Sequence, residues 1–437
     1  MPAAPDALPV GPDARDRLFA ALSRYDRIVL AVSGGADSIA LMTLFGEHRA
    51  ACPSAPAAMV ATIDHDLRAG SAEDAAFVVE AGRELGFEVV ARCWSGEKPT
   101  SDLQAAARAA RYRLLEEIAL EKGAGAVVTA HTRDDQAETF LLRLARGSGL
   151  KGLSAMAPVR RLGAIDLVRP LLGVGRDQLR ATLAVSGTPF REDPSNANRR
   201  FARVRIRDLM PALANEGMDA TRLAKTAERL ARADRAIEHG MDRLAAEALA
   251  VDPGGFARLQ MAPFRMAPEE IRLRLLVAAL GFVGGAAYGP RLERLERVAV
   301  RLLEADQVRL TLSGARLVRA GEHIHIFREA GRGGLPDTPI APGERIVWDG
   351  RFRLVLAETA PQMAAVRPLG PAWRKLVTPQ DRGGAPAAAL AGVPAFFVGE
   401  ALVAVPAFGH FANREWAQSI EAGFVVAPPG EPDSTHD

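Results

Sequence analysis

The chain has 437 residues, 48% hydrophobic and 25% charged, so it falls among globular proteins and is long enough for roughly three domains. No stretch of about 18 apolar residues lacks a charge, and the first residues lack a secretory signal pattern, so no membrane association is expected. The two cysteines, Cys52 and Cys93, form no C-x-x-C motif, which excludes a disulfide framework and a cysteine-based metal centre. A reducing, cytoplasmic location is therefore expected.

The formal net charge is only +2, so charge alone does not predict a nucleic-acid partner. Five of the 55 basic residues are lysines and the rest are arginines. Arginine suits the bidentate binding of phosphate, although a GC-rich genome would produce the same bias. Both explanations stay open on composition alone.

Short apolar runs alternate with helical patterns over residues 1–215. The predicted strands lie at residues 27–32, 59–63, 87–91, 126–130 and, more briefly, 167–169. The predicted helices begin at Ser38 and Ser71 and cover 103–122 and 134–145, with Ser71 as the expected cap of its helix. This alternation predicts an α/β fold with a doubly wound, Rossmann-like parallel sheet, in which ligands bind at the carboxyl ends of the strands.

Two further domains are predicted after this segment. Apolar residues at three- and four-residue spacing predict a helical domain over 216–330, with helices at 220–249, 268–280 and 291–303. A glycine-rich linker, Gly331–Pro336, leads into a small β-rich domain over 331–437, where Asp349-Gly350 is a hairpin turn signal. Strands are expected within 344–357 and 395–405, and a disordered tail at 428–437.

The strongest motif directly follows the first strand and opens a helix. It consists of Ser33, Gly34, Gly35, Ala36, Asp37 and Ser38. Because glycines let backbone N–H groups approach an anion and a helix N-terminus adds unpaired donors, the motif predicts a pyrophosphate-binding loop for ATP. Asp37 would repel phosphate unless a cation such as Mg²⁺ lies between them. A glycine-rich turn without a ligand is the alternative. No Walker motif occurs, and Gly147–Gly152 follows a helix, the wrong context for a dinucleotide fingerprint.

A second polar segment, His131–Thr139, follows the fourth predicted strand. Asp135 and Glu138 lie three residues apart at a helix start and share a face, where they can hold a metal ion or a substrate ammonium group. The alternative is that Asp134 and Asp135 cap the helix and favour its positive end. That alternative explains Glu138 and His131 less well.

A third polar segment, Asp64–Arg68, follows the second strand and brings His65, beside Ile63, to the same edge of the sheet. His65 is expected to be functional, although a lone histidine is more often structural. Arg108 and Arg111 lie three residues apart on one helix. They either point at phosphates or face solvent.

A run of five arginines without an acid spans nine residues: Arg199, Arg200, Arg203, Arg205 and Arg207. Such a run predicts contacts with the phosphate backbone of a nucleic acid. An ordinary charged helix face is the alternative. The two-residue spacing of the last three arginines is not helical, so several faces would be covered.

In combination these motifs resemble the bacterial tRNA(Ile)-lysidine synthetases, a family of the PP-loop ATP pyrophosphatase superfamily. The resemblance covers roughly residues 25–210 and rests on 31–38, 64–68, 107–112, 130–139, 146–153, 169–172 and 192–196. Thr132 departs from the pattern, because many members have a second histidine there. Val204 also departs, at a position where asparagine is frequent. Neither departure removes a residue assigned to chemistry.

The resemblance implies a two-step reaction on a tRNA(Ile) with a CAU anticodon. ATP adenylylates the C2 oxygen of the wobble cytidine and releases pyrophosphate; the ε-amine of free L-lysine then attacks C2, and AMP leaves. ATP and Mg²⁺ are the implied cofactors, with ATP bound by the 33–38 loop, Ile63 and His65. The implied catalytic residues are Asp37, Arg111, Asp135 and Glu138, with Asp37 and Asp135 as metal ligands. Which acid binds lysine and which binds Mg²⁺ stays open, as does a homodimer.

Three other functions explain fewer of the motifs. A tRNA thiolase built on the same loop would need a catalytic cysteine or a C-x-x-C cluster. A nonenzymatic nucleotide-binding regulator would need the loop but not the acids of 131–138. An ATP pyrophosphatase acting on a small metabolite would need neither the arginine run nor two added domains.

Overall fold

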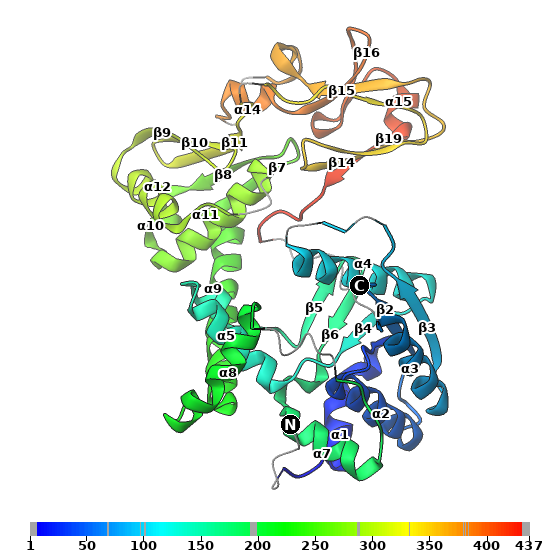
Figure 1. Ribbon diagram of the computed structural model, residues 1–437. Helices are drawn as coiled ribbons and strands as arrows, with labels where there is room; N and C mark the ends of the chain where they lie inside the picture. Colours follow the sequence, from blue (N-terminus) through cyan, green and yellow to red (C-terminus); the bar gives the residue numbers. More distant parts are fainter. Residues whose placement is uncertain are drawn as a thin grey trace. The chain divides into compact units, whose positions relative to one another are not determined.

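A computed structural model describes residues 7–67, 70–96, 98–99, 102–192, 199–285, 289–331, 333–378, 380, 382 and 384–430 (Figure 1). The chain divides into two compact units, Met1–Asp234 and Arg235–Asp437. Arg68, 193–196 and 431–437 of the predicted tail lie outside the described residues. The division into three domains stays a prediction. Within the described part, no helix is long and apolar enough to cross a membrane.

The first unit is built on a six-stranded sheet with the order β3-β2-β1-β4-β6-β5. Its strands are β1 Arg27–Ala31, β2 Ala57–Asp64, β3 Glu88–Cys93, β4 Ala126–Thr129, β5 Val159–Leu162 and β6 Ile165–Val168. Neighbouring strands pair in parallel except β5 and β6, which form an antiparallel hairpin. The predicted parallel sheet is confirmed, and β5 is an edge strand that the sequence patterns did not predict.

Helices cover both faces of this sheet, because its strands are apolar on both sides. Along β1, Ile28 and Leu30 pack with α1, α2, α3 and α7, whereas Val29 packs with α4. The helices are α1 Pro12–Phe19, α2 Ala36–Ala51, α3 Ser71–Glu84, α4 Leu103–Glu121, α5 Arg133–Leu144, α6 Leu150–Leu153, α7 Arg176–Ser186 and α8 Ala202–Asn215. Because β1, β4 and β6 are neighbours and parallel, their carboxyl ends lie side by side, and each is followed by polar residues.

Two local expectations for this unit are wrong. Ser71 does not cap α3: the cap position is Gly70, whose φ of 88° turns the chain into the helix one residue earlier. The last three arginines of the run lie on α8 and are therefore helical after all. Arg203 and Arg207 share one face of α8 because they are four residues apart.

The second unit begins within the long helix α9 Ala220–Ala248, which starts in the first unit. Its first part contains α10 Met261–Met266, α11 Glu269–Gly284 and α12 Leu292–Glu304, together with β7 Leu249–Asp252, β8 Phe256–Gln260, β9 Gln307–Leu312, β10 Ala315–Ala320 and β11 His323–Arg328. The strands form a sheet with the order β7-β8-β11-β10-β9. The expectation of a helical segment over 216–330 missed this sheet, whose buried side chains join those of the helices in one core.

The rest of the second unit is β-rich, as predicted. One sheet has the order β12-β15-β16-β17-β18 and another β13-β14-β19. The elements are β12 Thr338–Ile340, β13 Arg345–Trp348, β14 Phe352–Leu356, β15 Ala364–Pro368, α13 Trp373–Leu376, α14 Ala387–Ala391, β16 Pro394–Val398, β17 Ala401–Val405, β18 His410–Phe411, α15 Arg414–Ser419 and β19 Ile420–Phe424. The hairpin predicted at Asp349-Gly350 joins β13 to β14, and both turn residues have positive φ, 50° and 68°.

Candidate active site

The 33–38 loop joins β1 to α2 and leaves the start of that helix without a side-chain cap. The backbone N–H of Ser33 donates to Ser38 Oγ at 3.1 Å, and Ser38 Oγ donates to the carbonyl of Gly35 at 2.9 Å. Gly34 has φ of 86°, and a Cβ there would lie 3.4 Å from Val78 Cγ2. The loop is thus closed on itself by the serines, and the first N–H groups of α2 remain available to an anion.

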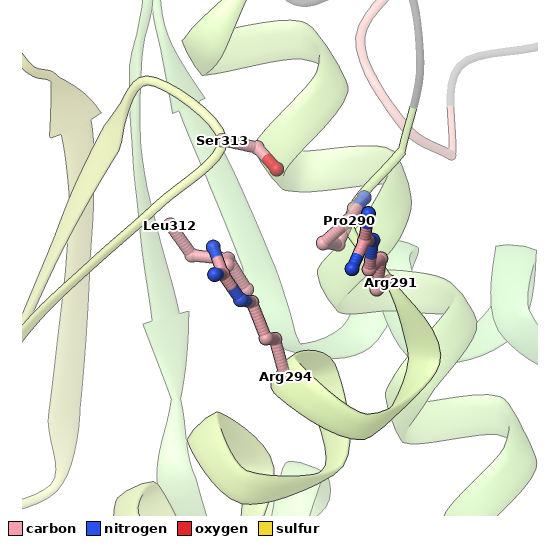
Figure 2. Close-up of a pocket in the computed structure, with 5 residues that line it drawn as sticks. All are labelled: Pro290, Arg291, Arg294, Leu312 and Ser313. Atoms are coloured by element: carbon pink, nitrogen blue, oxygen red, sulfur yellow. The ribbon is translucent and has the colours of Figure 1, made fainter.

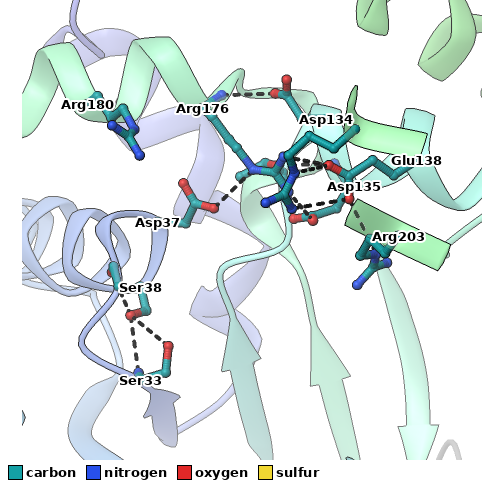
Figure 3. A network of polar contacts seen from close by, with 12 residues as sticks. Ser33, Asp37, Ser38, Asp134, Asp135, Glu138, Arg176, Arg180 and Arg203 are labelled. Atoms are coloured by element: carbon teal, nitrogen blue, oxygen red, sulfur yellow. Dashed lines mark hydrogen bonds and ion pairs between the residues drawn. The ribbon is translucent and has the colours of Figure 1, made fainter. Parts of the chain in front are cut away.

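One guanidinium joins the loop to the acids of α5 (Figure 3). Arg176, the first residue of α7, lies 3.4 Å from Asp37 Oδ2, 2.5 Å from Asp135 Oδ1 and 2.6 Å from Glu138 Oε1. Its backbone N–H donates to Asp134 Oδ2 at 3.0 Å. The structure therefore brings together Asp37, Asp135 and Glu138, as the sequence motifs predicted, through an arginine that they did not single out.

Asp135 both takes part in the N-terminal capping of α5 and contacts Arg176 in the acid cluster. Thr132 is the N-cap of α5; its Oγ1 accepts from the backbone N–H of Asp135 at 3.3 Å, while Asp135 Oδ2 accepts from the N–H of Thr132 at 2.9 Å. The other carboxylate oxygen of Asp135 faces Arg176. Asp134 binds the start of α7 instead of its own helix. The capping box thus fixes the orientation of an acid that also belongs to the site.

The acids sit in contrasting electrostatic environments. Burial raises the pKa of Asp37 to about 6; Arg176 opposes that rise, and Asp135 and Asp134 add to it. Burial would also raise the pKa of Asp135, but Arg176 and the N–H of Thr132 outweigh it and hold that pKa below its ordinary value. Of these two acids, Asp37 is the less compensated, since burial outweighs the effect of Arg176 there and does not at Asp135.

This donor set fits a divalent cation in its chemistry. Asp37 and Asp135 offer carboxylate oxygens, which Mg²⁺ prefers, and the pKa of Asp37 is raised by burial and, to a smaller extent, by the neighbouring Asp135 and Asp134. Arg176 lies between the two carboxylates, and the described residues contain no group of three or more His, Cys, Asp or Glu side chains arranged to hold a metal ion. A metal ion would therefore have to share these carboxylates with Arg176.

Glu138 is almost fully buried and is surrounded by arginines. Besides Arg176, two arginines of α8 form ion pairs with Glu138: Arg207 Nε lies 2.9 Å from Oε1, and Arg203 Nε lies 3.3 Å from Oε2. The side chains of Arg203 and Arg207 remain 38% and 39% exposed, whereas that of Glu138 is 1% exposed. Two arginines assigned to nucleic acid thus lie at the acid cluster, and their binding of nucleic acid stays a prediction.

Two other arginines of the run make contacts at the start of α8. Arg199 pairs with Asp208 at 2.8 Å, and Arg205 donates to the backbone carbonyls of Arg199 and Arg200. Arg199 and Arg205 thus organise the segment that leads into α8.

Arg111 acts electrostatically on both His131 and His65. His131 Nδ1 lies 2.9 Å from Thr129 Oγ1, and burial, with a further contribution from nearby arginines, lowers the pKa of His131 to about 3. Burial and then Arg111 lower the pKa of His65 as well. Both imidazoles are therefore neutral near pH 7.

Ile63 lies near the end of β2, half-buried beside the core under α4.

Arg176 is the functional candidate that the sequence analysis missed. It follows β6, the strand next to β4, and opens a helix, so its position at the carboxyl edge of a parallel sheet is the signal that could have found it. Cys52 directly follows α2, where its Sγ contacts Ser54 Oγ, and Cys93 is the last residue of β3.

Pockets elsewhere in the molecule do not coincide with this cluster. One of about 360 Å³ lies in the second unit and is lined by Pro290, Arg291, Arg294, Leu312 and Ser313 (Figure 2). Another, of about 770 Å³, runs along the small residues of α3 beside β3. Neither is lined by the serines of the loop or by the acids of α5.

The fold and the loop define the class of protein. The PP-loop domain family matches residues 14–213, the part of the chain that contains the strand, the uncapped glycine-containing loop, the helix start and the acids at the neighbouring strand end. This class uses ATP. Among solved structures, a U34-tRNA thiolase from Methanococcus maripaludis aligns with 50% of this chain and 78% of that chain at 16% identity, with a TM-score of 0.43.

Relatives define the family more narrowly. The tRNA(Ile)-lysidine synthase of Methylobacterium nodulans is 47% identical over 314 residues, which cover 70% of this chain and 91% of that protein. That of Ruegeria pomeroyi is 40% identical over 401 residues, 91% of this chain and 92% of the relative. The chain belongs to the tRNA(Ile)-lysidine synthase family, and it is an ATP-dependent ligase.

Proposed function

We propose that the chain ligates free L-lysine to C2 of the wobble cytidine in a tRNA(Ile) with a CAU anticodon. ATP first adenylylates the C2 oxygen and pyrophosphate leaves. The ε-amine of lysine then attacks C2, the bond from C2 to the adenylyl oxygen breaks, AMP leaves and the amine gives up a proton. The observation that carries this proposal is the Arg176 network, which places the carboxylates of Asp135 and Glu138 beside the ATP loop.

In the first step the 33–38 loop binds the pyrophosphate part of ATP. Its support is the uncapped start of α2, whose N–H groups and positive dipole end favour an oxyanion. Mg²⁺, held by Asp37 and Asp135, would supply charge neutralisation for the leaving pyrophosphate. His65 and Ile63, at the end of β2, lie where the nucleoside of ATP is expected in a parallel sheet.

In the second step the acids recognise lysine. An amino acid carries both an ammonium and a carboxylate, and Glu138 with the half-exposed Arg203 and Arg207 offers one carboxylate and two guanidinium groups. We assign lysine to this group, and Mg²⁺ to Asp37 and Asp135. The ε-amine must lose its proton before it attacks, because an ammonium group has no free electron pair. With a pKa of about 10.4, only about a few in ten thousand lysine ε-amines are neutral near pH 7. Desolvation in a buried site lowers that pKa.

The test is a product assay with the full chain. It combines ATP, Mg²⁺, lysine and a CAU-anticodon tRNA(Ile) transcript, followed by digestion and mass measurement of the nucleosides. A cytidine heavier by one lysine less one water, formed with release of AMP and pyrophosphate, is expected. Unchanged wobble cytidine from folded protein would refute the proposal. The matched RNA control is the same transcript with uridine in place of the wobble cytidine.

Two variants separate the roles of the acids. Asp37→Ala should abolish pyrophosphate release, whereas Glu138→Gln should raise the KM for lysine more than it affects adenylylation. Full pyrophosphate release by Asp37→Ala would refute its metal role. The cytoplasmic location and a homodimer stay predictions, which fractionation and sedimentation would check.

A further inference from the structure

Four arginines surround Tyr112 on the α4 face of the first sheet. Arg108 and Arg111 come from α4, Arg160 from β5, and Arg169 directly follows β6. The guanidinium carbons of Arg108, Arg111 and Arg160 lie 5.0, 5.1 and 5.3 Å from the centre of the Tyr112 ring. Arg108 Nη2 also donates to the Tyr112 hydroxyl at 3.1 Å. We call these four residues the arginine cluster.

No carboxylate balances the arginine cluster within the described part of the chain: none of its four members forms an ion pair there. Asp166, the acid on the neighbouring strand β6, is already bound by Arg24 and Arg161. The pKa of the Tyr112 phenol is consistent with this excess of positive charge. Burial would raise that pKa, yet the surrounding arginines hold it below its ordinary value. Four like charges in one place repel one another unless an anion joins them.

The cluster also contains buried donors without acceptors. Arg169 is only 4% exposed; its Nη1 donates to the carbonyl of Ala157 at 2.6 Å, while its Nε has no partner. The Nε of Arg111 is buried without a partner as well. An unsatisfied buried donor on a charged group is costly. An anion that accepts from these nitrogen atoms would remove both the repulsion and the missing hydrogen bonds.

The position of the cluster argues against the phosphates of ATP. The ATP loop opens α2, which packs on the opposite face of the sheet from α4. Arg108 and Arg160 are exposed, so a large ligand can reach them from solvent. Arginines stacked on an aromatic ring are the combination with which proteins hold single-stranded nucleic acid.

We infer that the arginine cluster binds a phosphate group, and that this group is a backbone phosphodiester of the RNA substrate. The inference rests on the proposed function for the identity of the RNA. Arg169 and Arg111 hold the phosphate from the buried side, and Arg108 and Arg160 hold it from the solvent side. Arg108, Arg111, Arg169 and Asp135 all act electrostatically on His131, so the cluster is near enough to the acids to position the nucleotide that is modified.

The experiment compares RNA and ATP affinity in Arg108→Gln/Arg160→Gln, whose two altered side chains are exposed, and in the single variant Arg160→Gln. Fluorescence anisotropy with a labelled CAU-anticodon tRNA(Ile) transcript is measured over a range of salt concentrations, and ATP affinity is measured separately. Arg113→Gln is the matched control, since Arg113 lies on α4 but pairs with Glu117 at 2.7 Å. The double variant should bind the transcript about tenfold or more weakly, with a salt slope lower by about one. ATP affinity should not change.

The other outcomes overturn the inference. A loss of ATP affinity with unchanged RNA affinity would assign the phosphate to ATP. Unchanged affinity for both ligands would leave the cluster a structural feature only. Neither readout needs product, so a wild-type protein that binds the transcript and forms no lysidine would refute the proposed function alone.

Discussion

Arg176 Nη2 lies 2.5 Å from Asp135 Oδ1, although the two residues are 41 positions apart in the chain. The same guanidinium reaches Glu138 at 2.6 Å and Asp37 at 3.4 Å. Residues that follow β1, β4 and β6 thus meet in one ionic network. Because the network is largely buried, its charges depend on one another much more than those of a surface pair.

Replacing Arg176 by alanine should destabilise the protein by about 3–5 kcal/mol, because it leaves buried carboxylates unpaired. Urea unfolding without divalent cations measures the loss. The control is Arg113→Ala, which breaks an exposed pair with Glu117 and should cost at most about 1 kcal/mol. Equal losses in the two variants would contradict the buried network.

Mg²⁺ should restore part of the stability lost in Arg176→Ala, since a second cation then replaces the missing guanidinium between Asp37 and Asp135. Thermal unfolding with Mg²⁺ and with EDTA gives the comparison. The gain from Mg²⁺ should be larger in the variant than in the wild type. A gain of equal size in both proteins would argue against a metal site at these acids.

His131 should make the protein sensitive to mild acid. Its pKa is lowered by burial to about 3, so the neutral imidazole stabilises the fold above pH 6.5, and this contribution is lost as the pH falls from 6.5 toward 3. At pH 5 the loss is about 2 kcal/mol. In His131→Gln the fall in unfolding free energy between pH 7 and pH 5 should be smaller by that amount. His239→Gln, on the exposed face of α9, should leave the fall unchanged.

Gly34→Ala should damage the ATP loop. Gly34 has φ of 86°, a region that costs an alanine about 1–2 kcal/mol, although the new Cβ would only reach van der Waals contact with Val78 at 3.4 Å. A lower melting temperature and a raised KM for ATP are expected. Gly149→Ala is the control, because Gly149 has φ of −71° and open space around its Cβ position. A wild-type KM for ATP in Gly34→Ala would show that the loop tolerates the strain.

Asp349 should be essential to the second unit. It accepts from Arg328 at 2.9 and 3.0 Å and from Arg351 Nε at 2.8 Å, and the side chain of Arg351 is only 3% exposed. Asp349→Ala should lower the free energy of unfolding by about 3–5 kcal/mol, because it leaves the buried guanidinium of Arg351 without its ion-pair partner. Chemical denaturation measures this cost. Glu400→Ala, which breaks an exposed pair with Arg367, should cost at most about 1 kcal/mol.

The parts that sequence could predict are those set by local rules. The 33–38 loop and the acids of α5 follow buried strands, and parallel strands end at one edge, so their proximity was predictable. The hairpin at Asp349-Gly350 was predictable because its turn requires positive φ.

The parts that sequence missed depend on contacts between distant segments. Arg176 looks like a surface arginine until β6 places it opposite Asp135. In β10 the exposed residues alternate with buried ones, but Arg319 occupies a buried position, paired with Asp306, which obscures the pattern. Ser71 lost its expected capping role to Gly70, since only the backbone angle there decides where the helix begins.

The choice of arginine has a chemical consequence beyond phosphate binding. The chain has five lysines among 55 basic residues, and every cation described above at the acids and at Tyr112 is an arginine. Adenylylated cytidine is an electrophile that reacts with amines. A lysine side chain of the protein held beside it would compete with free lysine for attack on C2. A guanidinium stays protonated and does not act as that nucleophile. Under the proposed function, these arginines therefore supply positive charge near the intermediate without forming a covalent bond to the RNA.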